Sequence, residues 1–212
     1  MAMFADRVAA GRQLAQVLDA GAYPDAVVFG IPRGGVVVAA EVARTLGVPL
    51  AAVVVRKLGA PSNMEFAIGA IAKEVTVVNP DAVRTALVTA EQLAFIEDVE
   101  RVELDRRARA FAPEPLDITN RTAMVVDDGI ATGATATAAC QELRRRGAAR
   151  VVLAVPVAPA DWHPSHGAVD EYVCLHVEPN FWAVGQFYDD FTQTTDAEVV
   201  ELLSHDLRDG PA

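Results

Sequence analysis

Short apolar runs that end in turn residues and lead into helices recur along this chain of 212 residues, and this pattern constrains the fold most strongly. The runs are rich in Val and Ala without polar alternation, which is typical of parallel strands buried on both faces. At least three strand–turn–helix units follow one another, which predicts an α/β fold with right-handed crossovers. We therefore expect a doubly wound, mostly parallel five-stranded sheet, with strands at residues 26–31, 50–55, 122–126, 151–155 and 172–177.

Residues between these runs show helical spacing or turn signals. Residues 58–74 break the pattern with Gly, Pro, Ser and Asn, so we expect a mobile, flexible loop with a small hairpin into residues 75–78. Helices are expected at residues 4–20, 36–46, 90–111 and 133–146, with a short one near the end of the tail.

The organisation of the chain is predicted to be a single domain over residues 1–212. The strand–helix pattern defines a core over about 20–177. The segment after residue 177 departs from this pattern, and we expect it to form a small C-terminal hood over about 178–203 together with the N-terminal segment.

The charge of the chain limits its partners. A net charge of −11 repels the phosphates of nucleic acids and of anionic membranes, so neither is an expected partner. A small anionic substrate remains compatible where cations gather, and the two lysines, Lys57 and Lys73, lie in one short stretch. The two cysteines lie in apolar segments, and no apolar run approaches the ~20 residues of a membrane span. We therefore expect a cytoplasmic location.

Unusual residues follow three of the expected strands. Arg33, Gly34 and Gly35 follow the first, Arg56 and Lys57 the second, and the segment 127–135 the third. Ligands of open parallel sheets bind at the carboxyl ends of the strands. Cations together with paired carboxylates suit a ligand that carries both phosphates and hydroxyls. Alternatively, 32–35 is a plain strand-to-helix turn, and Arg56 and Lys57 are ordinary solvated cations.

The segment 127–135 is the most specific of the three. Its two glycines let the backbone approach a ligand closely, and consecutive N–H groups at the start of a helix form an anion site. Thr132 and Thr135 add hydroxyl donors, while Asp127 and Asp128 can accept hydrogen bonds from sugar hydroxyls. Neither a Walker A loop nor a Gly-x-Gly-x-x-Gly fingerprint is present.

The residues 124–135, MVVDDGIATGAT, strongly resemble the phosphoribosyl-pyrophosphate (PRPP) motif of type I phosphoribosyltransferases. Residues 31–35 look like the pyrophosphate loop of that family, and residues 56–74 occupy the place of its flexible loop. Residues 180–189, NFWAVGQFYD, resemble the hood of purine-type members. The resemblance covers residues 26–190 and is closest to the uncharacterised bacterial "predicted phosphoribosyltransferase" branch.

The resemblance implies a role for each motif residue. Asp127 and Asp128 would hold the ribose hydroxyls. Mg²⁺ would lie mainly on PRPP oxygens and water. The remaining roles are pyrophosphate binding by Arg33, Gly34 and Gly35, pyrophosphate neutralisation by Arg56 or Lys57, 5-phosphate binding by Ala131, Thr132, Gly133, Ala134 and Thr135, base stacking by Trp182, and a water-mediated metal contact by Asp189. Trp182 could instead be a core aromatic.

The implied activity is transfer of ribose 5-phosphate from PRPP to a nitrogenous base or related nucleophile, with release of pyrophosphate. Ala131 stands where 6-oxopurine members carry an Asp, and the strand 151–155 leads into 156–159 without a lysine, so the acceptor stays open. One alternative is a non-catalytic regulatory protein that binds PRPP or a nucleotide, and another is hydrolysis or phosphate transfer at the same site. The family usually pairs its subunits, so the resemblance also implies a homodimer.

Overall fold

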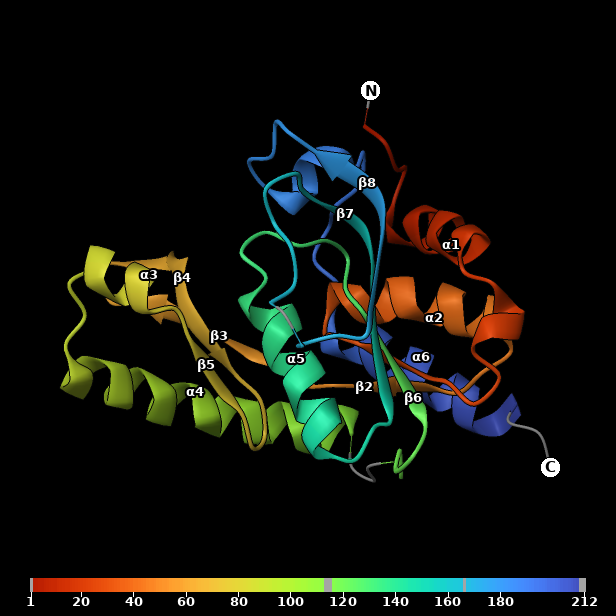
Figure 1. Cartoon of the computed structure of the whole chain (residues 1–212), viewed down its shortest axis with the longest axis horizontal. Helices are drawn as coiled ribbons and strands as arrows, with labels where there is room; N and C mark the ends of the chain where they lie inside the picture. Colours follow the sequence, from red (N-terminus) through yellow and green to blue (C-terminus); the bar gives the residue numbers. More distant parts are fainter. Residues whose placement is uncertain (1, 113–115, 166, 210–212) are drawn as a thin grey trace.

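A five-stranded parallel sheet lies at the centre of the computed structural model, which describes residues 2–112, 116–165 and 167–209 (Figure 1). The strand order is β2-β1-β6-β7-β8, and all neighbouring strands pair in parallel. Each expected core strand is present, which confirms the predicted α/β sheet. The bounds are β1 (Val27–Gly30), β2 (Leu50–Ala52), β6 (Thr122–Val126), β7 (Arg150–Pro159) and β8 (Glu171–Glu178).

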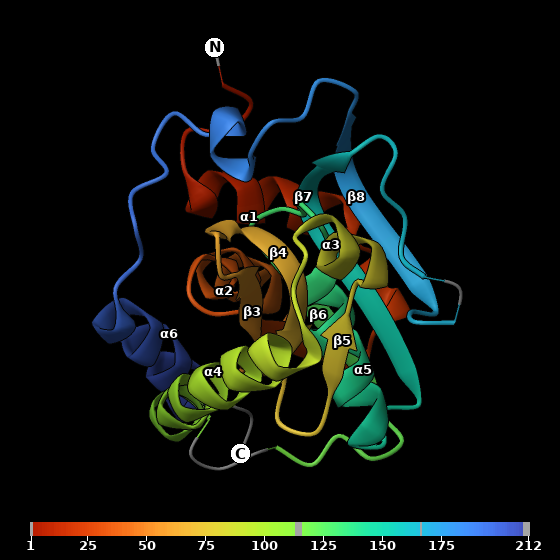
Figure 2. The ribbon, with the colours of Figure 1, turned by 90° about the vertical axis from the view of Figure 1, so that its left-hand side faces the viewer.

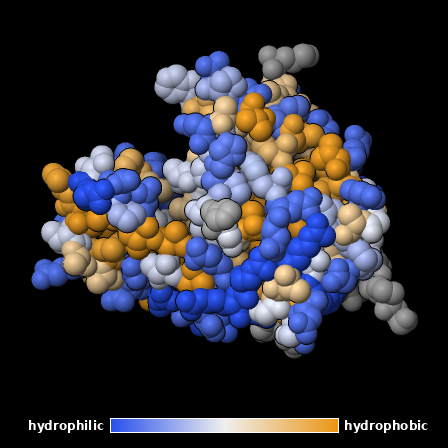
Figure 3. All heavy atoms as spheres, viewed as in Figure 1, coloured by the Kyte–Doolittle hydropathy of each residue, from blue (hydrophilic) through white to orange (hydrophobic). Residues whose placement is uncertain are grey.

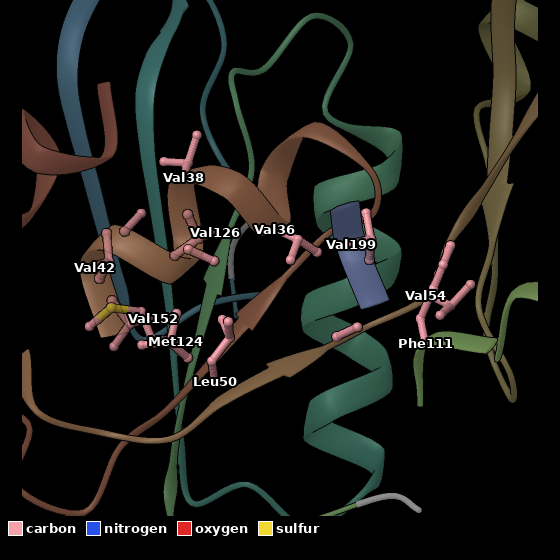
Figure 4. Packing of buried hydrophobic residues seen from close by; sticks show 14 of the residues in the cluster. Val36, Val38, Val42, Leu50, Val54, Phe111, Met124, Val126, Val152 and Val199 are labelled. Carbon is pink, nitrogen blue, oxygen red and sulfur yellow. The ribbon is translucent and has the colours of Figure 1, made fainter. Parts of the chain in front are cut away.

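Helices cover both faces of this sheet because its strands carry apolar side chains in both directions. On one face, Met124 and Val152 pack with side chains from α1, α2 and α6. On the other face, Phe29 and Leu153 pack against α5. Figure 4 shows part of the first cluster, with Met124 and Val152 close to Val42 of α2. These four helices are α1 (Arg7–Val17), α2 (Gly34–Leu46), α5 (Ala134–Arg145) and α6 (Asp196–Asp209).

Local sequence sets the ends of the helices. The Asp6 side chain accepts a hydrogen bond of 2.7 Å from the Ala9 N–H and thereby caps the start of α1. Gly47 ends α2 in the left-handed region (φ 67°), as its position predicts. Within the described ranges, no helix is long and apolar enough for a membrane crossing.

A second sheet stands where the sequence predicts a mobile loop with a small hairpin. It is antiparallel, has the strand order β3-β4-β5, and lies beside the long helix α4 (Figure 2). Most of the predicted loop over 58–74 is therefore strand, whereas the predicted small hairpin into 75–78 is present as the antiparallel pair β4 and β5. The elements are β3 (Arg56–Ala60), β4 (Asn63–Ile71), β5 (Thr76–Val78), the short α3 (Pro80–Thr85), which the sequence did not predict, and α4 (Ala90–Phe111), whose bounds it predicted.

The glycines of this segment explain the wrong prediction. A Cβ on Gly59 would lie 2.4 Å from the Met64 carbonyl oxygen, and one on Gly69 would lie 2.3 Å from the Val77 carbonyl oxygen. These glycines therefore permit close strand pairing instead of marking a loop. The sheet also has its own apolar side chains, because Leu58, Ile68 and Ile71 are fully buried.

The N-terminal segment pairs with the chain beyond β8. Phe4 forms a parallel bridge with Tyr188, and the Asp189 N–H donates to the Phe4 carbonyl at 2.9 Å. This contact joins the N-terminal residues to the segment 179–195, which contains the short helix η2 (Val184–Phe187). The last helix, α6, lies elsewhere, since its Val199 is buried in the cluster with α2 (Figure 4). The proposed division into core and hood, which includes residues outside the described ranges, stays a prediction.

Candidate active site

Two strand ends bring the predicted glycine loop and the acidic pair, Asp127 and Asp128, together. Gly30 at the end of β1 is in register with Val126 at the end of β6. A Cβ on Gly34 would lie 2.1 Å from Asp128 Oδ2, and one on Gly35 would lie 2.8 Å from Asp127 Oδ1. Any larger residue would push the loop off the carboxylates, so the two glycines are required for this packing. The Pro32–Arg33 peptide bond is cis.

The acidic pair is held by its own backbone and by one tyrosine. Asp127 Oδ1 accepts a hydrogen bond of 2.9 Å from the Asp128 N–H, and the Tyr188 hydroxyl donates to the Asp128 carbonyl oxygen at 2.6 Å. Burial, and then the Asp128 charge, raise the pKa of Asp127 well above its ordinary value. Burial also raises the pKa of Asp128, and the Arg7 guanidinium opposes that rise. Burial and the repulsion between the two carboxylates therefore disfavour the state in which both are ionised.

Arg7 is a site residue that sequence reasoning missed. Its Nε donates to Asp128 Oδ2 at 2.7 Å, and the side chains of Arg7 and Asp128 are only 12% and 16% exposed. Its Nη1 donates to the Thr192 carbonyl at 2.8 Å, and its guanidinium carbon lies 3.9 Å from the centre of the Phe191 ring. The contact with Asp128 spans 121 residues, so no local pattern could reveal it.

The turn into α5 keeps the open geometry that its sequence predicts. Gly133 has φ +74° and immediately precedes the helix, while Ala131 and Thr132 are exposed. The first N–H groups of a helix have no partner within it, so the start of α5, with Ala134 and Thr135, is suited to bind an anion.

Trp162 is a second residue that sequence reasoning missed. A Cβ on Gly133 would lie 2.1 Å from Trp162 Nε1, so the indole packs directly on this glycine. Tyr172 of β8 supports the indole edge-on, with 5.5 Å between ring centres. The tryptophan thereby forms a wall of the turn next to its exposed residues.

Each predicted pyrophosphate cation has a carboxylate partner. Arg33 Nη1 lies 3.3 Å from Asp196 Oδ1 on α6. Arg56 Nη2 lies 2.6 Å from Glu100 Oε2 on α4, in a largely buried pair. Lys57 Nζ lies 3.1 Å from the Glu65 carboxylate, which is 91% exposed. The structure therefore does not bring Arg33, Arg56 and Lys57 onto one shared point, and the exposed Lys57 pair is the most easily opened.

The two predicted residues of the 179–195 segment are both at the surface. Trp182 is 91% exposed, so the alternative that it is a core aromatic is wrong. Its backbone N–H donates to Gln186 Oε1 at 2.8 Å, which fixes the backbone and leaves the ring outside. Asp189 is exposed beside the buried Tyr188. Among the described residues, no cluster of three or more His, Cys, Asp or Glu side chains could enclose a metal ion.

The parallel α/β sheet and the acidic pair followed by a Thr-Gly turn agree with the fold that the resemblance to type I phosphoribosyltransferases implies. Residues 5–192 match the family model described as "Phosphoribosyl transferase domain", and the chain belongs to this family. The family prediction is thereby confirmed.

Two strains of Mycobacterium tuberculosis (CDC 1551 and H37Rv) contain curated relatives with a provisional phosphoribosyl transferase name. They are 50% identical over 213 aligned residues, which is 99% of this chain and 48% of theirs. This chain thus spans about half the length of these relatives. A uracil phosphoribosyltransferase of Staphylococcus aureus (strain Newman) is 35% identical over 92 residues, 42% of this chain and 44% of its own.

Solved structures agree with the fold. The crystal structure of the protein TT1426 from Thermus thermophilus has a TM-score of 0.74 and 42% identity, and the match covers 95% of this chain and 98% of that one. A Neisseria gonorrhoeae protein crystallised with bound ppGpp has a TM-score of 0.51 at 16% identity, covering 94% and 92% of the two chains. This second similarity concerns the fold alone.

Proposed function

We propose that this protein binds PRPP and transfers its ribose 5-phosphate to a nitrogen nucleophile with release of pyrophosphate. The observation that carries the proposal is the packing of Asp127 and Asp128 between two helix starts. Gly34 and Gly35 begin α2 on one side, and Gly133 precedes α5 on the other. A ligand with two phosphate groups and hydroxyls between them matches this order of anion, hydroxyl and anion sites.

The proposed reaction breaks the bond between ribose C1 and the pyrophosphate oxygen and forms a bond from C1 to the acceptor nitrogen. Asp127 and Asp128 would accept hydrogen bonds from the ribose hydroxyls, and the N–H groups at the start of α5 would hold the 5-phosphate. Catalysis would consist of positioning and of electrostatic stabilisation of the oxocarbenium-like ribosyl group. The bonding electron pair leaves with pyrophosphate, and the acceptor nitrogen releases its proton to water.

Pyrophosphate needs counter-charges, which this chain supplies in ion pairs. Lys57 is the best candidate, because its partner Glu65 is almost fully exposed. Arg33 would contact pyrophosphate after leaving Asp196, whereas Arg56 is tied to the buried Glu100. Mg²⁺, when bound, would add charge neutralisation on the phosphate oxygens, mainly through substrate and water, with Asp189 as a water-mediated contact.

The acceptor would stack on Trp182, whose exposed ring is free of the core. Ala131 at the exposed turn offers no carboxylate to handle a base proton, and the loop after β7 offers no lysine. We therefore propose that hypoxanthine and guanine are not the acceptors.

A regulatory PRPP-binding protein is the second candidate. The observation that favours it is the pairing of Arg33, Arg56 and Lys57 with carboxylates, because a catalyst must free such cations to stabilise leaving pyrophosphate.

Pyrophosphate release in the presence of PRPP and Mg²⁺, measured with a panel of purine and pyrimidine bases, separates these candidates. Release that requires one base supports the transferase and identifies the acceptor. Release without any base indicates a hydrolase. Binding of PRPP without release under any condition would contradict the transferase and support the regulatory protein.

A further inference from the structure

Arg7 joins three parts of the molecule at the acidic pair. It belongs to the first turn of α1, directly after the cap residue Asp6. Its side chain reaches Asp128 at the end of β6 through Nε, and reaches Thr192 and Phe191 in the segment 179–195 through Nη1 and its flat face. Nothing in the proposed reaction uses this arginine, although it is one of the most buried cations at the site.

We propose that Arg7 is a positioning residue that holds Oδ2 of Asp128, so that Oδ1 faces the ribose hydroxyl as an ionised acceptor. This inference rests on the proposed function. Among the described residues, Oδ2 has the Arg7 contact, and no hydrogen bond from another residue reaches Oδ1. One oxygen of Asp128 is thus fixed by the protein, and the other is left for a ligand.

The charges around Asp128 explain why a cation is needed there. Asp127 lies next to it in sequence and accepts its N–H, so two carboxylates share a partly buried space. The Tyr188 hydroxyl, which faces the same group, binds the backbone carbonyl and carries no charge. Arg7 opposes the rise in the pKa of both Asp127 and Asp128, and Asp190, whose pKa is lowered chiefly by its hydrogen bonds from Thr192, also lies near Arg7.

Arginine has a shape that lysine lacks at this position. Its planar group donates to Asp128 and Thr192 at the same time and stacks on Phe191. A lysine would keep the positive charge, but it would lose the planar group that donates in two directions and stacks on Phe191. Charge and orientation can therefore be separated by comparing Arg7→Gln with Arg7→Lys.

The test is calorimetric titration with PRPP and Mg²⁺ at several pH values between 6 and 8.5. Arg12→Gln is the matched control, because Arg12 lies on the same helix in an exposed pair with Glu41. Without Arg7, Asp128 takes up a proton at higher pH, so Arg7→Gln is expected to bind about tenfold more weakly at pH 6 and to recover as pH rises. Arg7→Lys should lose affinity to a similar extent at every pH, and Arg12→Gln should match the wild type.

Several results would overturn the inference. Tighter binding by Arg7→Gln would make Arg7 a blocking contact, and a loss of affinity that is equal at every pH would make it only structural. A failure of the wild type to bind PRPP counts against the proposed function instead. Carbon-13 NMR titration of Asp128, assigned with Asp128→Asn, then tests Arg7 without ligand: a pKa of Asp128 that is higher in Arg7→Gln supports the inference, and an unchanged pKa overturns it. Circular dichroism confirms that each variant is folded.

Discussion

The 127–135 loop and the β3–β5 sheet look similar in sequence but differ in structure. Both contain glycines and small polar residues between apolar runs. In the 127–135 loop, Gly133 takes a left-handed conformation and opens a helix. In the sheet, Gly59 and Gly69 lie inside strands, where a side chain would strike the neighbouring backbone. Glycine therefore marks a close approach in both regions, to the Trp162 indole at Gly133 and to a neighbouring strand at Gly59 and Gly69.

The β3–β5 sheet also differs from a mobile lid in the number of its buried contacts. A lid that closes over a substrate needs few buried contacts. The β3–β5 sheet instead buries Leu58 and Ile68, and it joins α4 through the pair of Arg56 with Glu100. We expect any closure over the site at the tip around residues 61–66, which is exposed throughout. Figure 3 shows hydrophobic and hydrophilic side chains side by side at the left-hand end of the molecule, where the β3–β5 sheet and α4 lie.

The largest expected effect comes from the buried side of the sheet. Leu58→Ala should lower the free energy of unfolding by about 2–5 kcal/mol, because Leu58 is completely buried. Met64→Ala at the exposed tip should change it by less than about 0.5 kcal/mol. Urea unfolding measures both. Equal, small effects would mean that this segment is a loop after all.

The turn at Gly133 provides the next test. Gly133→Ala combines a strained left-handed φ with a clash against Trp162, and should cost about 1–3 kcal/mol of stability and weaken PRPP binding. Gly167→Ala is the control, because Gly167 has a similar φ of +80° and open space around it. Fluorescence of Trp162 in a Trp182→Phe background should change only in the Gly133 variant. Identical behaviour of both variants would remove Trp162 from the site.

Two ion pairs of the β3–β5 sheet should differ in the same way. Glu100→Gln leaves Arg56 without its partner in a largely buried position and should cost about 1–3 kcal/mol. Glu65→Gln should leave stability unchanged, because this partner of Lys57 is exposed. Thermal unfolding measures both variants. A large loss in Glu65→Gln would contradict the assignment of Lys57 as the readily available cation.

The smallest effect is a gain in stability at the acidic pair. The raised pKa of Asp127 means that the folded protein holds this proton more tightly than the unfolded chain, so stability falls as pH rises through that range. Asp127→Asn removes this loss, so its stability relative to the wild type should be higher at pH 8 than at pH 5. Urea unfolding of the variant and the wild type at the two pH values measures this difference in stability. A difference of the same size at pH 5 and at pH 8 would contradict the raised pKa of Asp127.

The sequence predicted those features that depend on neighbouring residues. Apolar runs located the five core strands, and the helix over residues 90–111 has the bounds that its spacing indicates. The segment 127–135 resembled a PRPP motif because its turn, glycine and helix start are all local. Its placement beside Gly34 and Gly35 followed from the parallel strand order, which brings the carboxyl ends together.

Features that depend on distant residues were missed. Arg7 reaches Asp128 across 121 residues, and Trp162 reaches Gly133 from the loop after β7. Gly59 and Gly69 lie where β3 pairs with β4 and where β4 pairs with β5, and this role does not show in the local composition, which suggests a loop. The homodimer, Mg²⁺ and the cytoplasmic location stay predictions.

The central claim is that the acidic pair binds the ribose of PRPP. Calorimetric titration of the purified protein with PRPP and Mg²⁺ tests it directly, with Asp128→Asn as the variant and Asp105→Asn on α4 as the control. The account predicts binding by the wild type and the control, and at least about a tenfold loss of affinity in Asp128→Asn, which corresponds to the loss of a hydrogen bond to a charged group. Equal affinity of all three proteins, or no binding by the wild type, would contradict it.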